Sequence, residues 1–474
     1  MVRIPLRSAP AECRLLGYLL FLALAACALT VISGAVASIV YTDFEPQLRA
    51  AGLTLQHLRP IHETYAFAWV FLGGVSVVYY YLFREHGPFP GPMRLRMALQ
   101  LALWTIAGIG ILVTLLQGNF TGREYAGYHP AFSAMIMLGW LLFAWNFFAR
   151  RGLSLRGQPV YVYMWSVGVV LFVVTYTEIH LYLLEAISLR PLRDLSIQWR
   201  GSGMLVGAFN QIAYGCLMYI VCCVRRDNSY AHSRTGFSLF YVGVLNSFTN
   251  YGHHTFHLPQ SPWIHWISFL VSMLEVIILA KVFIDVLAMR RAERPAVDLV
   301  VADKFVRWAG IWTFLMLSLS LLISIPPINA LIHGTHVVVA HSMGSMLGID
   351  SFILWAGAAY IIRSMVGPDH PVVRGGRIRL AIPWVSVFLI FFWAAFLGSG
   401  VATGIGRYMD AAAPDLSFLL SSFPSHMFIA GFGLALAILW ILGLWLLAIG
   451  SAIWRGGAAP LSEVEQPPPI EGRQ

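Results

Sequence analysis

The sequence predicts an all-α integral membrane protein, a bundle of twelve transmembrane helices with both termini in the cytoplasm. Composition supports this fold class, because 58% of the 474 residues are hydrophobic and only 11% are charged, whereas a soluble domain carries about 25% charged residues. The charges also fall in short clusters between apolar runs that are long enough to cross a hydrocarbon core of about 30 Å. The formal charge of +9 therefore bears on membrane orientation and not on nucleic-acid binding.

Twelve apolar segments follow one another and leave no room for a soluble domain. They cover residues 15–41, 62–84, 96–117, 129–149, 159–187, 203–224, 236–257, 262–289, 305–328, 335–364, 382–406 and 424–453. The first segment is too long for the core of a signal peptide, so we expect it to remain as a helix. The predicted parts are a cytoplasmic N-terminal segment (1–14), the membrane domain (15–453) and a disordered, proline-rich cytoplasmic tail (454–474).

Arginine clusters follow every even-numbered segment. Examples are "FREHGPFPGPMRLR" after the second, "ARRGLSLRG" after the fourth and "MRRAERP" after the eighth. Because arginine-rich loops stay on the cytoplasmic side, both termini should be cytoplasmic, in the inner membrane of a prokaryote. The loop "SLRPLRDLSIQWR" after the fifth segment departs from this rule, since its three arginines fall on the outer side. They are either interface anchors or partners of acidic groups.

Histidines at one depth of the bundle give the main chemical signal. His62 begins the second segment, while His253 and His254 end the seventh. His341 lies about six residues into the tenth segment, roughly 10 Å below its outer end at about 1.5 Å per residue. A lone histidine in a membrane is more often a hydrogen-bonded contact between helices. Several at one level predict a site for iron, copper or zinc, the metals that suit imidazole.

Two stretches resemble the heme–copper oxidase superfamily and, within it, the catalytic subunit of nitric oxide reductase. They are "GHHTFHLPQSPWIHWISFLVSMLEVI" (252–277) and "INALIHGTHVVVAH" (328–341). With His62, the resemblance extends from the second to the tenth segment. It implies a bundle that holds two hemes, one low-spin and one high-spin and both b-type, together with one non-heme metal, which is iron rather than copper.

The resemblance also implies a role for individual residues. His62 would be an axial ligand of the low-spin heme, and His341 the proximal ligand of the high-spin heme. His253 and His254 would bind the second metal, and Glu275 would be the buried catalytic glutamate beside it.

The tenth segment departs from the family pattern at Met343. The family has a second histidine there, two residues after His341, as the other ligand of the low-spin heme. A thioether can also bind heme iron and raises its reduction potential, so we expect Met343 to be that ligand. The alternative is that Met343 only packs, and that the low-spin heme is five-coordinate or absent.

The sixth segment departs further. The family takes a third ligand for the second metal about fifty residues before the histidine pair, and that count leads to Gly203. The glutamates that nitric oxide reductases carry one and two turns later are replaced by Gly207 and Gln211. Asn210 or Gln211 could offer an amide oxygen, which is a weak ligand for a transition metal.

Glu178 and His180, near the outer end of the fifth segment, could reach the site. A structural pair is the favoured interpretation.

These residues favour a membrane oxidoreductase that resembles nitric oxide reductase and converts two NO to N2O. Its electrons would come from a cytochrome c-type subunit or a quinol. The alternatives are a nitric oxide dismutase-like enzyme, a non-catalytic heme protein that binds or senses NO or O2, and a transporter. A terminal oxidase fits less well, because the third histidine is missing and neither Tyr214 nor Tyr251 has the spacing of the crosslinked tyrosine. The expected partners are the lipid bilayer and a small gas.

Overall fold

The computed structural model describes residues 6–454 except 124, 256–257, 293–294 and 409–415. The predicted disordered tail therefore lies, from residue 455 onward, outside the described residues. All regular elements in the described part of the chain are helical, which confirms the all-α membrane fold class.

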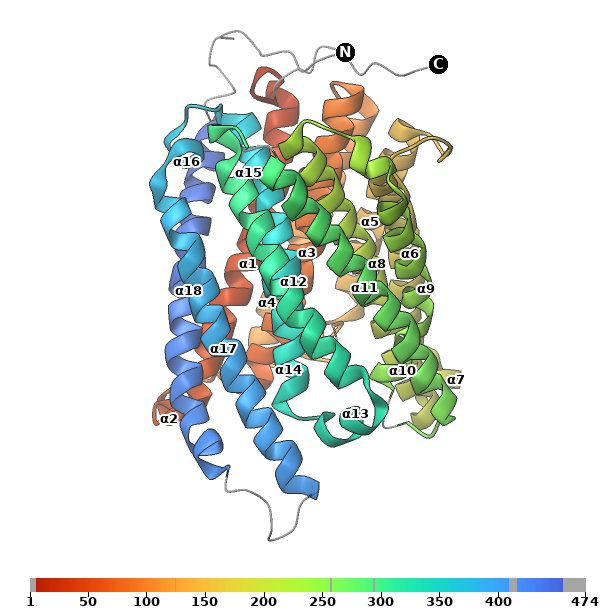
Figure 1. The fold of residues 1–474 in the computed structure, drawn as a ribbon, viewed down its shortest axis with the longest axis vertical. Helices are drawn as coiled ribbons and strands as arrows, with labels where there is room; N and C mark the ends of the chain where they lie inside the picture. Colours follow the sequence, from red (N-terminus) through yellow and green to blue (C-terminus); the bar gives the residue numbers. More distant parts are fainter. Residues whose placement is uncertain (1–5, 124, 256–257, 293–294, 409–415, 455–474) are drawn as a thin grey trace.

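Eleven spans among the described residues are long and apolar enough to cross a membrane (Figure 1). Ten of them are built on a single long helix, and the remaining one joins three consecutive helical elements. They are α1 (Pro10–Ser38), α3 (Leu55–His86), α4 (Gly91–Leu116), α5 (Pro130–Arg151), α6 (Val160–Glu178), α8 (Pro191–Arg225), α11 (Pro262–Ala292), α12 (Val300–Ser324), the composite of α14 (His336–Met343), η6 (Gly344–Ser351) and α15 (Phe352–Val366), α17 (Gly376–Tyr408) and α18 (Ser417–Trp454).

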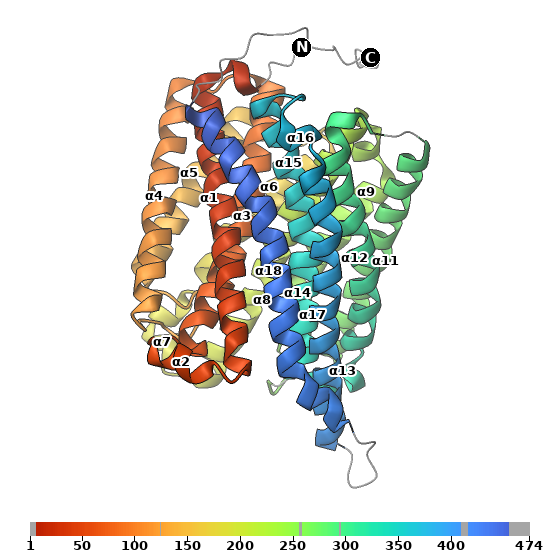
Figure 2. The ribbon, with the colours of Figure 1, turned by 90° about the vertical axis from the view of Figure 1, so that its left-hand side faces the viewer.

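Short helices connect the spans. They are η1 (Leu6–Ser8), η2 (Ile39–Tyr41), α2 (Glu45–Ala50), η3 (Leu181–Leu183), α7 (Glu185–Ser188), η4 (Ser229–His232), η5 (Val297–Leu299), α13 (Pro326–Ile332) and α16 (Pro371–Arg374). Helices α2, α7, α10 and α13 lie at one end of the bundle, and α1 begins and α18 ends at the other (Figures 1 and 2).

The seventh expected span, 236–257, is not among the eleven. It falls on α9 (Arg234–Thr249), which has only 16 residues, and on α10 (Tyr251–His254). Regular helix is interrupted at Asn250, although the backbone N–H of Asn250 still donates to Asn246 O at 2.8 Å. Residues 256–257 lie outside the described part of the chain.

Several boundaries differ from the expectation by five residues or more. The first span begins at Pro10 rather than residue 15, and the fifth helix ends at Glu178 rather than 187. The sixth begins at Pro191 rather than 203, so the arginine-rich outer segment forms the first turns of α8. Proline in the first turn and Asp194 close behind it both favour a helix start there.

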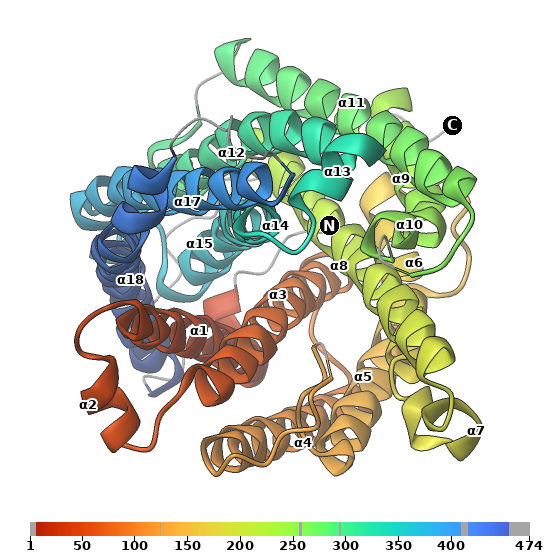
Figure 3. The same cartoon turned by 90° about the horizontal axis from the view of Figure 1, so that it is seen from below.

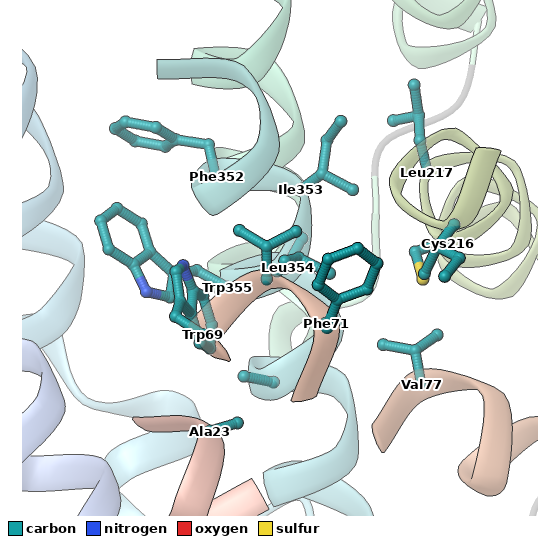
Figure 4. Close-up of a cluster of buried hydrophobic side chains, with 14 of the residues drawn as sticks. Ala23, Trp69, Phe71, Val77, Cys216, Leu217, Phe352, Ile353, Leu354 and Trp355 are labelled. Carbon is teal, nitrogen blue, oxygen red and sulfur yellow. The ribbon is translucent and has the colours of Figure 1, made fainter. Parts of the chain in front are cut away.

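Helices α3 and α8 are the most enclosed spans, and they lie beside α14 and α15 near the centre of the bundle (Figure 3). Trp69 of α3 packs beside Trp355 of α15, with ring centroids 6.4 Å apart (Figure 4). The Trp69 Nε1–H also donates to Ser351 Oγ at 2.9 Å, where η6 ends. These contacts fix α3 against the tenth span.

Element η6 is a π-helix that directly follows Met343. It packs closely on α12, because a β-carbon on Gly344 would lie 2.1 Å from Met316 Sδ and one on Gly348 2.6 Å from the Trp312 ring. A π-helical turn contains an extra residue and changes which side chains face inward, and such turns are frequent at functional sites. The packing of η6 on α12 thus sets the orientation of the residues that directly precede η6.

Candidate functional site

The histidine-bearing elements meet at one end of the bundle, where α3 begins, α10 lies and α14 begins (Figure 1). His254 lies within electrostatic range of His341 and His333. The structure therefore brings together the seventh- and tenth-segment histidines that the sequence singles out. The backbone of His253 belongs to α10, but its side chain lies outside the described part of the structure.

His62 faces α1. Its Nδ1 lies 2.9 Å from Thr30 O, and because a carbonyl only accepts, Nδ1 carries the hydrogen. Nε2 is then the nitrogen with a lone pair for a metal. A histidine whose other nitrogen donates to a carbonyl is the usual form of a metal-binding imidazole, so His62 fits an axial heme ligand.

His341 and Met343 lie two residues apart, on opposite faces of α14. Two residues along a helix rotate by about 200°, so the two side chains point away from each other. His341 Nδ1 lies 3.4 Å from Ser320 Oγ of α12; a hydroxyl can accept as well as donate, so this contact is compatible with the tautomer that leaves Nε2 as the ligating nitrogen. The Met343 side chain packs against the hydrophobic core. One helix with a donor on each face fits a position between two hemes.

Gly203 of α8 faces the α10 histidine. A β-carbon on Gly203 would lie 3.3 Å from His254 Cδ2 and 3.3 Å from Asn250 Oδ1. The position that the residue count matches to the missing third ligand is thus beside His254. The structure places the Asn250 amide there, a residue that the sequence analysis did not consider.

The next two positions on the same face of α8 also meet α9. A β-carbon on Gly207 would lie 2.4 Å from Ser247 Oγ. One on Gly243 would lie 2.7 Å from Gln211 Nε2 and 3.4 Å from Glu275 Oε1. The space beside Gly207 is therefore filled by Ser247, and Gln211 lies close to Glu275.

Glu275 of α11 is buried between α8, α9 and α11, with 6% of its surface exposed. Its Oε2 accepts a hydrogen bond from Asn246 Nδ2, and Asn246 Oδ1 accepts one from Ser272 Oγ at 2.9 Å. Its Oε1 has no hydrogen-bond partner among the described residues. Oε1 is therefore the oxygen that can hold or release a proton.

Glu178 and His180 are used within the protein. His180 Nδ1 lies 2.7 Å from Tyr176 O, and Nε2 lies 2.7 Å from Ser133 Oγ. Glu178 accepts from the Arg200 guanidinium, with Nε at 2.7 Å. Both ring nitrogens are occupied, which agrees with a structural pair.

One further buried titratable group, Asp350, was missed in the sequence analysis. Asp350, on η6, is 4% exposed and makes no side-chain hydrogen bond within the described residues. The Tyr214 hydroxyl of α8 lies within electrostatic range of both Asp350 and Glu275. The sequence did contain a signal for Asp350. A carboxylate inside an apolar membrane segment costs free energy, and such a residue is therefore a candidate for a functional role.

Among the side chains that the structure describes, no group of three histidine, cysteine, aspartate or glutamate residues gathers closely enough to hold a metal ion. A second metal would therefore need His253, whose side chain is not described, or a donor of another type. The unpartnered amide oxygen of Asn250 beside His254 is such a donor.

Comparison with known proteins agrees with the fold. Residues 14–433 match the family described as "Cytochrome C and Quinol oxidase polypeptide I". A similar solved structure is described as a heme-copper terminal oxidase dimer; it is 14% identical, with a TM-score of 0.67, over 95% of this chain and 85% of that one. At this identity the likeness concerns the fold. The comparison with curated proteins found no match. The chain belongs to the heme–copper oxidase subunit I family of membrane oxidoreductases.

Proposed function

We propose that this family member is a nitric oxide reductase, which converts two NO, two electrons and two protons to N2O and water. The supporting observation is Glu275, a buried carboxyl group with one unpartnered oxygen, on the helix that directly follows the α10 histidines. Water release at such a site needs protons, and an enclosed carboxyl group is a suitable local source.

The proposed function assigns ligands for two hemes and a second metal as the family pattern implies. His341 would hold the high-spin heme, His62 and Met343 the low-spin heme, and His253 and His254 the non-heme metal, for which iron suits the donors better than copper. When bound, these groups supply the electrons and the place where the N–N bond forms.

Side chains of the protein hold and release the proton. Asn246 holds Glu275 Oε2 through its amide, so the proton resides on Oε1. Glu275 releases it toward the oxygen that leaves as water, and the enclosing helices α8, α9 and α11 exclude bulk water from the carboxyl group.

One observation favours a second candidate, a nitric oxide dismutase. Gly207 and Gln211 replace the two glutamates of the family pattern, and Ser247 fills the space beside Gly207. The conversion of two NO to N2 and O2 consumes neither protons nor electrons, so it would tolerate this loss of acids.

We also propose that α9 and α10 complete a twelfth crossing. Since α1 begins and α18 ends at the same end of the bundle, the number of crossings must be even (Figure 2). The arginine-rich loops then favour cytoplasmic termini in the inner membrane of a prokaryote.

The test is gas analysis of the purified protein under anaerobic conditions. With NO and either reduced cytochrome c or a quinol, a reductase produces N2O only when donor is present. A dismutase produces N2 and O2 without donor. A protein that binds heme and yields neither set of products would contradict both assignments and leave a gas-binding role.

A further inference from the structure

Asn250 lies at the junction of α9 and α10 and is tied to three helices. Its Nδ2 donates to Gly203 O of α8 at 3.0 Å, and its backbone N–H donates to Asn246 O at 2.8 Å. Its backbone carbonyl accepts from Ser268 Oγ of α11 at 3.3 Å. A residue held by one side-chain and two backbone hydrogen bonds is a rigid support for its remaining side-chain atom.

The remaining atom is Oδ1, which has no hydrogen-bond partner among the described residues although the residue is only 4% exposed. The orientation of the amide is determined, because a flipped amide would place Oδ1 against the carbonyl oxygen of Gly203, and neither oxygen can donate a hydrogen bond. A buried amide oxygen without a partner is costly, and such atoms are rare in folded proteins. Its presence calls for a ligand.

Asn250 Oδ1 also lies near the His254 ring. Both Oδ1 and His254 Cδ2 lie 3.3 Å from the position of a β-carbon on Gly203, so they are at most twice that distance apart. His254 Nε2 is bonded to that Cδ2. The amide oxygen of Asn250 would therefore lie near an ion bound by His254 Nε2.

We propose that Asn250 Oδ1 is a protein ligand of the second metal, together with His254, in place of the side chain that Gly203 lacks. The assignment rests on the proposed function, which supplies the second metal. Gly203 is needed because a β-carbon at 3.3 Å would press on both donors.

The donor set selects the metal. A neutral amide oxygen is a hard ligand and imidazole is intermediate, so the combination suits ferrous iron better than cuprous copper, which prefers soft ligands. Neither of these two donors carries a charge, so retention of the ion depends on each of them.

The experiment measures non-heme metal per heme by mass spectrometry on the purified full chain, before and after dialysis against 1,10-phenanthroline. The wild-type protein should retain one non-heme iron for two hemes. Asn250→Leu should keep both hemes and lose the metal at least about tenfold more readily. Asn250→Asp, which keeps an oxygen at the same place and adds charge, should retain it at least as well as wild type.

The matched control is Asn146→Leu on α5. It removes another fully buried amide, whose Oδ1 accepts a hydrogen bond from Arg96 Nε at 2.7 Å. It should leave metal retention unchanged. Metal retention by Asn250→Leu equal to wild type would overturn the assignment while leaving the proposed function intact. Two hemes and no non-heme metal in the wild-type protein would overturn the second metal of the proposed function as well.

Should Asn250→Leu fail to bind heme, two milder variants decide the matter. Gly203→Ala should weaken retention and Asn250→Asp should not. Unchanged retention in Gly203→Ala, or loss of metal in Asn250→Asp, would overturn the role of Oδ1.

Discussion

Gly34 of α1 lies so close to the imidazole of His62 that a β-carbon on it would fall 2.9 Å from both Cε1 and Nδ1. This contact, next to the hydrogen bond with Thr30 O, holds the ring in one orientation. Helix α1, which carries no expected ligand, therefore determines the geometry of a ligand on α3.

Gly34→Ala should displace the His62 ring by about half an ångström or more, because carbon atoms in contact prefer about 3.5–4.0 Å. The expected result is loss or weakening of the low-spin heme, seen as a fall in heme per protein and in the low-spin optical band. Gly443→Ala, at a helical glycine of α18 with open space around it, is the control. An unchanged spectrum in Gly34→Ala would argue against His62 as a heme ligand.

Met343→His should lower the reduction potential of the low-spin heme, because histidine–methionine ligation raises that potential relative to two histidines. Met343→Leu, which keeps the packing volume, should convert the same heme to a five-coordinate, high-spin form. Redox titration and EPR spectra measure the two effects. If neither variant changes the heme signals, Met343 serves only in the core.

The sequence was sufficient to predict the fold class and the shared level of the histidines, because both follow from hydropathy and from the direction of each span. The break at Asn250 was not predictable, since the hydropathy of residues 236–257 runs on through the interruption. Nor was the early start of α8, because the arginines of its first turns look like a loop when only charge is considered.

The amide at Asn250 and the carboxyl at Asp350 required three-dimensional structure. Residue spacing led to Gly203 as the missing ligand position, but only packing between α8 and α10 shows which side chain fills the space beside it. The π-helical turn of η6 similarly changes which face of the tenth span Asp350 occupies, and no spacing rule anticipates such a turn.

Glu275→Gln should slow NO turnover by about 100-fold or more, because loss of a positioned proton donor typically has that effect. Heme content and NO binding should remain unchanged, since the amide keeps the volume of the carboxyl group. Glu12→Gln is the matched control, a buried glutamate that accepts from the Phe89 N–H at 3.0 Å. Full activity in Glu275→Gln would exclude Glu275 as the proton donor.

Asp303→Asn should destabilise the bundle by up to about 3–5 kcal/mol, because it removes a carboxylate that pairs with the buried Arg225 charge. The two groups lie 3.5 Å apart and their side chains are only 8% and 4% exposed. Replacing both, as in Arg225→Met with Asp303→Leu, should recover most of the loss. Thermal unfolding of the three variants in detergent measures this, and a double variant no better than the single one would contradict it.

Asp350→Asn should stabilise the protein and slow its turnover. A carboxyl group in the membrane interior is costly when it is charged, and the amide removes the possibility of charge. If the carboxyl group passes protons toward Glu275 past the Tyr214 hydroxyl, turnover with NO and donor should fall while heme content stays constant. Thermal unfolding and turnover are measured on the same preparation. A gain in stability with unchanged turnover would assign Asp350 to neither step and leave proton supply to Glu275 alone.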